Sequence, residues 1–193
     1  VLQEIETKLG HVAVPLQIPI GLESNLVSLV DLVAMQAVYF DGPQGGTLRR
    51  TEIPAELMET ARHARAGLLD TLSLYSDELM ERMLEEQEIE EDLLHRIIRE
   101  QTIAREITPV LMGSAFKNRG IQPLLDAVTR YMPSPLDRMS YARDNVNEGA
   151  EIALSADPDA PSAAMAFKIV EESFGQLTYA RVYQGRITRG GVY

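Results

Sequence analysis

Residues 107–135, ITPVLMGSAFKNRGIQPLLDAVTRYMPSP, combine the signals of a strand, a loop and a helix. Ile107–Phe116 is apolar and partly β-branched, which is typical of a buried strand. Lys117–Gly120 is polar and ends in glycine, which predicts a turn. From Ile121 to Met132 the apolar residues recur every three or four positions, which predicts an amphipathic helix ended by Pro133. This succession indicates an α/β fold.

The residues at the start of the chain also predict a helix followed by a strand. Val1–Leu9 has apolar residues at helical spacing and is followed by Gly10, a typical helix end. From Val12 to Ile20 the apolar residues fall on even positions, which is the period of a strand. Pro15 and Pro19 cannot donate to a ladder, so this strand is expected to be short or to lie at an edge.

A hairpin is predicted next. Gln36–Phe40 reads as a strand, Asp41–Gly46 as a turn and Thr47–Glu52 as the returning strand. The turn is rich in glycine, but no Lys-Ser or Lys-Thr follows it, so a hairpin is favoured over a phosphate-binding loop.

The next segment is helical and acidic. Pro54–Tyr75 predicts one amphipathic helix, Ser76 the N-cap of a second, and Ile89–Arg105 a third. Between Glu52 and Glu100 there are 14 acidic and five basic residues, a balance of 5 − 14 = −9 out of a total of −11. Such a surface repels phosphate backbones and suits a basic protein partner.

The C-terminal part changes character after Pro133-Ser134-Pro135. Residues 136–161 show no periodicity and are predicted to be a linker. Strands are predicted at 163–170, 177–183 and 186–188, the start of an antiparallel domain. From Ser162 to Tyr193 there are four basic and two acidic residues, so any contact with RNA is expected here.

Composition excludes several classes of protein. Hydrophobic residues make up 45% and charged residues 24% of the 193 residues, and no apolar run has the roughly 20 residues of a membrane helix, so a soluble protein is expected. The chain has no cysteine, which excludes disulfide frameworks and thiolate metal sites. His11, His63 and His95 lack the spacing of a metal site, so no metal ligand is expected. Val1 begins within a predicted helix without a leader, which suggests an excised fragment.

The chain resembles the elongation factor G family of translational GTPases over essentially its whole length. The residues that carry the resemblance are the 107–135 stretch, VPLQIPIGLESN at 14–25, VDLVAMQAVYF at 30–40, SDELMERMLEEQEI at 76–89, DPDAPSAAMAFKI at 157–169 and LTYARVYQG at 177–185. The sequence departs from the family at Glu172–Gly175, which lacks the family's proline, and in the linker, which leaves room for a specialised paralogue.

The resemblance implies an α/β architecture in several parts. Residues 1–25 and 106–135 would be the C-terminal part of a P-loop, Ras-like GTP-binding domain, and 26–105 an α+β insertion subdomain. Residues 136–161 would be the linker, and 162–193 the first antiparallel strands of a translation-factor β-barrel.

The resemblance also implies site residues. Gly113–Phe116 matches the fifth guanine-nucleotide motif, so the Ala115 amide would donate to the guanine carbonyl oxygen, Ser114 would support the loop and Phe116 would flank the base. The insertion would bind the ribosomal stalk protein, with Leu57, Glu59 and Arg62 representing the contact surface. Lys168, Arg181 and Arg186 would contact ribosomal RNA.

The parent protein is therefore expected to be a cytoplasmic, ribosome-dependent GTPase that binds GTP or GDP with Mg²⁺ and drives translocation of tRNA and mRNA. The chain itself has no G-x-x-x-x-G-K-[ST] loop and no Asn-Lys-x-Asp, so it is expected to be inactive alone and to hold no catalytic residue and no cofactor. Any homo-oligomer is expected to be an artefact of truncation. Two alternatives remain: a sister GTPase of the ribosomal-protection or release and recycling type, and a non-enzymatic protein-binding module built on the acidic helices.

Overall fold

The computed structural model describes residues 2–21, 25–147 and 149–192. The chain divides into two compact units, Val1–Met132 and Pro133–Tyr193. Residues 22–24 of the family-like stretch 14–25, and the two chain ends on which predictions were made, lie outside the described residues.

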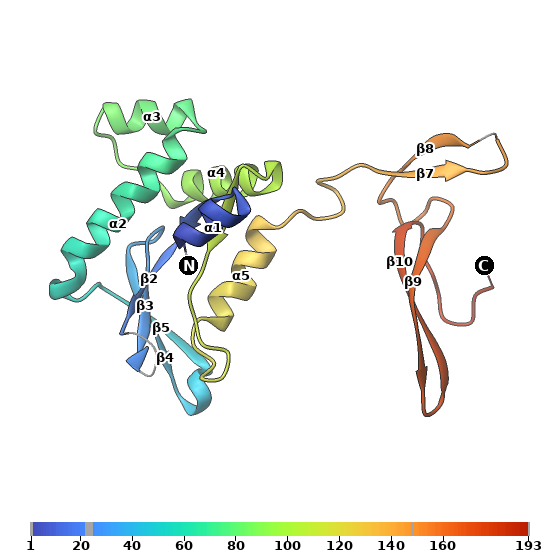
Figure 1. The fold of residues 1–193 in the computed structure, drawn as a ribbon, viewed down its shortest axis with the longest axis horizontal. Helices are drawn as coiled ribbons and strands as arrows, with labels where there is room; N and C mark the ends of the chain where they lie inside the picture. The colour runs from blue at the N-terminus through green and yellow to red at the C-terminus, as the bar shows by residue number, and fades with distance from the viewer. Residues whose placement is uncertain (1, 22–24, 148, 193) are drawn as a thin grey trace. The chain divides into compact units, whose positions relative to one another are not determined.

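The first unit combines helices with an antiparallel sheet and a parallel pair of strands (Figure 1). Along the chain its elements are α1 (Leu2–Leu9), β1 (Val12–Pro15), β2 (Gln17–Ile20), β3 (Ser28–Asp31), β4 (Gln36–Asp41), the 3-10 turn η2 (Pro43–Gly45), β5 (Thr47–Thr51), α2 (Ala55–Ser73), α3 (Asp77–Leu84), α4 (Glu91–Ala104), β6 (Ile107–Val110) and α5 (Ile121–Tyr131). Strands β2, β3, β4 and β5 form an antiparallel sheet in that order, and β1 pairs with β6 in parallel.

The predicted strand Val12–Ile20 is divided between these two sheets. Its first half, β1, pairs with β6, and its second half, β2, pairs with β3. Leu16 lies at the division, where its N–H donates to the carbonyl oxygen of Val110 and its carbonyl accepts from the N–H of Leu32, each over 3.0 Å. The four-stranded sheet therefore includes Gln17–Ile20, which the sequence analysis placed with the 1–25 segment rather than with the insertion subdomain.

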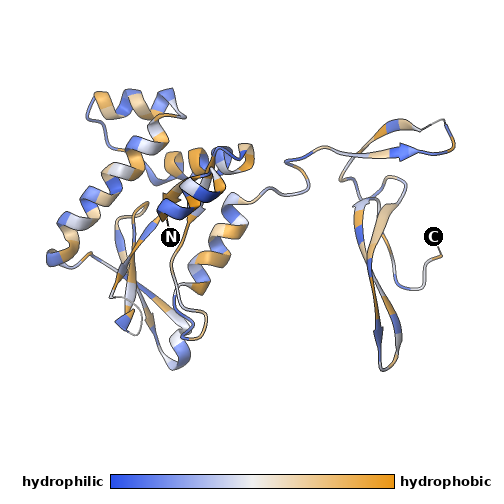
Figure 2. Ribbon diagram, viewed as in Figure 1, coloured by the Kyte–Doolittle hydropathy of each residue, from blue (hydrophilic) through white to orange (hydrophobic). Residues whose placement is uncertain are grey.

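The acidic region forms the three predicted helices. The side-chain oxygen of Ser76 accepts a hydrogen bond from the N–H of Leu79 over 3.3 Å, which confirms the predicted N-cap of α3. The apolar faces of α2, α3 and α4 meet in one core, and the ribbon of α4 has several orange, apolar stretches in Figure 2. The buried residues of this core include Leu68 and Leu72 of α2, Leu79 of α3, Leu93, Leu94, Ile97 and Ile98 of α4, and Val14 and Ile107 of the parallel strands.

Helices α4 and α5 are joined by polar contacts as well. The His95 ring lies between two residues of α5: its Nδ1 is 2.7 Å from the hydroxyl oxygen of Tyr131, and its Nε2 is 2.7 Å from a guanidinium nitrogen of Arg130. Burial raises the pKa of Tyr131 to about 12. Burial, and then the nearby charge of Arg130, lower the pKa of His95. The neutral imidazole is therefore the form that fits this junction.

Strand β6 is shorter than the predicted Ile107–Phe116. It ends at Val110, whose partner in the ladder is Pro15, the last residue of β1. Residues 111–113 follow without a strand neighbour among the described residues, so they form no ladder. The loop that follows β6 therefore begins earlier than the apolar run indicates.

The second unit consists of two antiparallel hairpins, β7 (Ser140–Asp144) with β8 (Ala150–Leu154) and β9 (Ala163–Glu172) with β10 (Gly175–Gln184). The first hairpin lies within residues 136–161, the segment expected to be a linker, so this segment contains two paired strands. Asp144 stabilises its turn, since one carboxylate oxygen accepts from the N–H of Val146 over 2.9 Å. The prediction of a strand at 186–188 is wrong, because these residues form no strand and pair with no described strand.

Within the described ranges, no helix is long and apolar enough to cross a membrane. Over the same ranges there is no group of three or more His, Asp or Glu side chains arranged to hold a metal ion.

Candidate functional site

Within the segment that connects β6 to α5, residues 113–120 form a loop closed by backbone hydrogen bonds. Ser114 and Arg119 form an antiparallel bridge in which each N–H donates to the other's carbonyl oxygen, over 2.8 and 3.1 Å. Inside this bridge the N–H of Lys117 donates to the carbonyl of Ser114 and that of Asn118 to the carbonyl of Ala115, over 3.2 and 3.1 Å. These bonds give the loop a defined shape.

Two glycines allow the ends of this loop to meet. Gly120 has φ +79°, and a Cβ atom there would lie 2.3 Å from the carbonyl oxygen of Met112 and 2.9 Å from the Cα of Gly113. A Cβ on Gly113 would lie 2.5 Å from the carbonyl oxygen of Arg119. Neither position has room for a side chain, and Gly120 also has a backbone conformation that favours glycine.

The three predicted guanine-contact residues are consecutive: Ser114 belongs to the closing bridge, and Ala115 and Phe116 follow it at the tip of the loop. Ser114 is half-buried, Ala115 is exposed, and the side chain of Phe116 is 99% exposed. Among the described residues, no acceptor lies within hydrogen-bonding distance of the N–H of Ala115 or of Phe116. The tip therefore presents amide donors to an external carbonyl oxygen and an aromatic face on which a planar base can stack.

Residues that the sequence analysis missed support the base of the loop. Gln17 is 3% exposed, and its side-chain oxygen accepts from the N–H of Met112 over 3.2 Å. The guanidinium of Arg119 donates to the carbonyl oxygen of Leu26. Gln17 occupies an odd position in an alternating strand, a pattern that predicts a solvent-facing side chain, so only the structure reveals its buried role.

The predicted stalk-binding residues share one helix, α2, but differ in exposure. Glu59 and Arg62 are exposed, and neighbouring positions three apart lie on the same side of a helix. Leu57 is half-buried and packs against the main core. Only the two charged residues are therefore fully available to a partner.

The acidic helices are also tied to one another by an ion-pair network. The Glu78 carboxylate of α3 lies 2.7 Å from the guanidinium of Arg96 in α4 and 3.1 Å from that of Arg82. The hydrogen bond from Arg96 is the largest of the effects that lower the pKa of Glu78. The charges on this surface are therefore partly compensated within the chain.

The three predicted RNA-contact residues lie in the second unit and are exposed. The Lys168 ammonium lies 5.9 Å from the centre of the Tyr179 ring, and the Arg181 guanidinium 4.9 Å from that of Tyr183. Arg186 instead lies 3.9 Å from the Asp159 carboxylate. Lys168 and Arg181 thus combine a cation with an aromatic ring on the β9–β10 hairpin, whereas Arg186 has an acidic neighbour.

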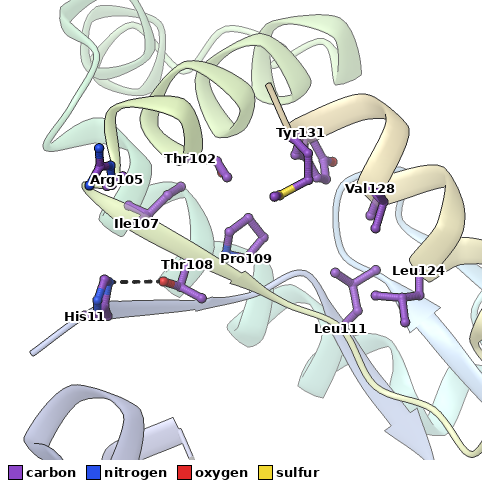
Figure 3. A pocket seen from close by; sticks show the side chains of 12 residues that line it. His11, Thr102, Arg105, Ile107, Thr108, Pro109, Leu111, Leu124, Val128 and Tyr131 are labelled. Atoms are coloured by element: carbon purple, nitrogen blue, oxygen red, sulfur yellow. Dashed lines mark hydrogen bonds between the residues drawn. The ribbon is translucent and has the colours of Figure 1, made fainter. Parts of the chain in front are cut away.

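A pocket of about 320 Å³ lies between β6 and α5, beside the end of α4 (Figure 3). Its walls are mainly apolar, with side chains that include Ile107, Leu124 and Val128. At one end the Thr108 hydroxyl lies 3.5 Å from Nδ1 of His11. None of the predicted site residues lines this pocket, and the sequence analysis did not predict it.

Comparison with known proteins identifies similar sequences over the whole chain. The chain is 52% identical over 193 residues to elongation factor G of Rhodopirellula baltica and covers 28% of that protein. It is 48% identical over 190 residues to elongation factor G 1 of Syntrophus aciditrophicus, and 46% identical over 188 residues to elongation factor G 1 of Desulfotalea psychrophila, covering 27% of each. The chain thus spans little more than a quarter of the length of these relatives. No protein-family profile matches it.

A solved structure is also similar. A crystal structure of a protein from Thermus thermophilus aligns with a TM-score of 0.73 and 26% sequence identity. The alignment covers 98% of this chain and 26% of that protein. The similarity confirms the mixed α/β fold class.

Proposed function

We propose, from the homology of this chain to elongation factor G over its whole length, that it is a segment of a ribosome-dependent GTPase that promotes translocation of tRNA and mRNA. The observation that carries the proposal is the 52% identity over 193 residues. Identity across both units favours a translation elongation factor over a free-standing binding module. The intact protein would act in the cytoplasm and bind GTP or GDP with Mg²⁺.

The 113–120 loop is the part of this chain proposed to contact the nucleotide. The N–H of Ala115 donates to the carbonyl oxygen of guanine, Ser114 supports the loop through its bridge to Arg119, and Phe116 flanks the base. Two backbone amides without a partner among the described residues, together with the exposed Phe116 ring, fit this role. The bound nucleotide supplies the phosphoanhydride that is hydrolysed, while this loop contributes recognition of the base.

The nucleotide proposal is tested on the full-length protein that contains this chain. GDP is compared with the diphosphate of 2-aminopurine riboside, which lacks the guanine carbonyl oxygen. The hydrogen bond to the carbonyl oxygen contributes about 1 kcal/mol, and the analogue also lacks the N1 proton of guanine, so GDP is expected to bind at least about fivefold more tightly. Equal affinities would contradict the contact at Ala115. The separate 193-residue chain is expected to show no GTP hydrolysis above background, with or without ribosomes.

The exposed charged face of α2 is proposed to bind the stalk protein of the ribosome. Glu59 and Arg62 are the contacts on this chain, with Leu57 as a partly buried apolar neighbour. Titration of the isotope-labelled chain with the stalk-protein C-terminal domain should shift the amide signals of α2. Glu59→Lys should weaken these shifts, and Glu151→Lys, an equal change of charge on β8, should not. Unchanged signals at millimolar partner would refute the proposal.

The β9–β10 hairpin is proposed to contact ribosomal RNA phosphates through Lys168 and Arg181, with Arg186 beside it. Each phosphate contact that is lost should lower the slope of log affinity against log salt by about one. Lys168→Ala and Arg181→Ala in the full-length protein should show this change in ribosome binding. A slope equal to that of the wild type would assign these residues to surface solubility alone.

A further inference from the structure

The turn between β4 and β5 lies beside the 113–120 loop, although the two are far apart in the sequence (Figure 1). The side-chain nitrogen of Asn118 donates to the carbonyl oxygen of Gln44 over 3.0 Å. The side-chain nitrogen of Gln122, in the first turn of α5, donates to the carbonyl oxygen of Gly45 over 3.1 Å. Two amide side chains therefore hold consecutive carbonyl groups of the turn.

The backbones of the turn and the loop are also in close contact. Gly45 is buried, and a Cβ atom there would lie 2.9 Å from the carbonyl oxygen of Asn118 and 3.5 Å from that of Lys117. Backbone contact without an intervening side chain leaves little freedom for one segment to move without the other.

Asn118 connects this contact to the tip of the loop. Its side chain bonds to Gln44, while its backbone N–H donates to the carbonyl oxygen of Ala115 over 3.1 Å. A single residue thus joins the β4–β5 turn to Ala115, whose N–H has no hydrogen-bond acceptor among the described residues. Displacement of the turn must either break one of these two bonds or move Ala115.

We propose that the β4–β5 turn positions the guanine-contact loop, with Asn118 and Gln122 as positioning residues that set the distance between the Ala115 N–H and the carbonyl oxygen of the base. This inference rests on the proposed function of the loop. Because β4 and β5 belong to the four-stranded sheet, a partner that displaces that sheet changes the selectivity for a 6-oxo purine. The sheet and the base-recognition loop are therefore mechanically coupled.

Two variants of the full-length protein separate this role from general stability. Asn118→Gly removes the side chain at a position with φ +48°, which glycine adopts without strain. Gln122→Met keeps the length of the side chain and removes its donor. Gln176→Met, at an exposed position of β10, is the matched control. The affinities for GDP and for the 2-aminopurine analogue are measured for each variant, and thermal unfolding verifies that each one is folded.

Each positioning variant is expected to lose about fivefold in affinity for GDP and to bind the analogue as the wild type does, so that discrimination between the two ligands decreases. The control is expected to keep the wild-type ratio. Wild-type discrimination in both positioning variants would overturn the inference, as would an equal loss for both ligands, which is the sign of a purely structural role. If the wild type itself binds GDP and the analogue equally well, the proposed guanine contact is refuted, and so is the inference that rests on it.

Discussion

Replacing Gly120 by alanine tests the geometry of the 113–120 loop most directly. The new Cβ would lie 2.3 Å from the carbonyl oxygen of Met112, a backbone atom that cannot rotate away. The positive φ of +79° adds about 1–3 kcal/mol of backbone strain. Forcing apart a packed contact adds about 1–3 kcal/mol. The substitution should therefore destabilise the first unit by about 2–6 kcal/mol.

Gly67→Ala is the matched control, since it adds the same methyl group within α2. Among the described residues, no atom beyond the adjacent residues and the backbone of α2 itself lies within 4 Å of a Cβ there, and alanine has the higher helix propensity. A gain of about 0.5–1 kcal/mol is therefore expected. Circular dichroism at 222 nm follows the unfolding of the first unit, because the α-helices of the described residues all belong to it. For a unit of this size, Gly120→Ala should lower the melting temperature by roughly 8–20 °C, and Gly67→Ala should raise it by roughly 2–4 °C. Shifts of the same sign and size would refute the reasoning.

The remaining predictions concern helix α4. Leu94→Ala, at a fully buried position, should lower the free energy of unfolding in urea by about 2–5 kcal/mol. Leu84→Ala, at an 80% exposed position of α3, should lower it by less than about 0.5 kcal/mol. Equal losses would contradict the assigned core. The lowered pKa of His95 means that the unfolded chain binds the proton more strongly, so the stability that this group contributes is complete above about pH 6.5 and is lost as the pH falls below it. His95→Gln should reduce the loss of stability between about pH 7 and pH 5. His63→Gln, at an exposed position, should leave this loss unchanged. If the unfolding free energies of both variants depend on pH in the same way, His95 is excluded as the source.

The local features of the fold could be predicted from the sequence because their causes lie within a few residues. Ser76 caps α3 through the N–H three positions later, and the β4–β5 hairpin follows from a short run of turn residues. The division at Leu16 could not be predicted, since it depends on strands that pair with each half from distant parts of the chain. The β7–β8 hairpin was missed because its strands are short and largely exposed, so they lack a clear alternation of apolar and polar residues.

The candidate site shows the same division between local and distant causes. Ser114, Ala115 and Phe116 were located by the resemblance of their motif, which is contiguous in sequence. The residues that hold this loop in place were not located, since Gln17 lies in β2 and Gln44 in the turn between β4 and β5, both far from the loop in sequence. A glutamine that accepts from a distant amide leaves no periodic signal. The surfaces of this chain that would contact the ribosome stay predictions from the family resemblance.

The parallel pairing of β1 with β6 has a consequence for how such a gene can change. Residues 16–106 leave the sheet at Pro15 and return to it at the adjacent strand, where a crossover of about a dozen residues would be sufficient. A recombination event could therefore add or remove the intervening segment in a single step without separating the two strands. However, Leu94 of that segment now shares a core with Val14 and Ile107. A deletion that is simple in the gene would expose apolar surface in the protein. Further substitutions would have to cover or replace that surface before a shorter form of the protein could persist.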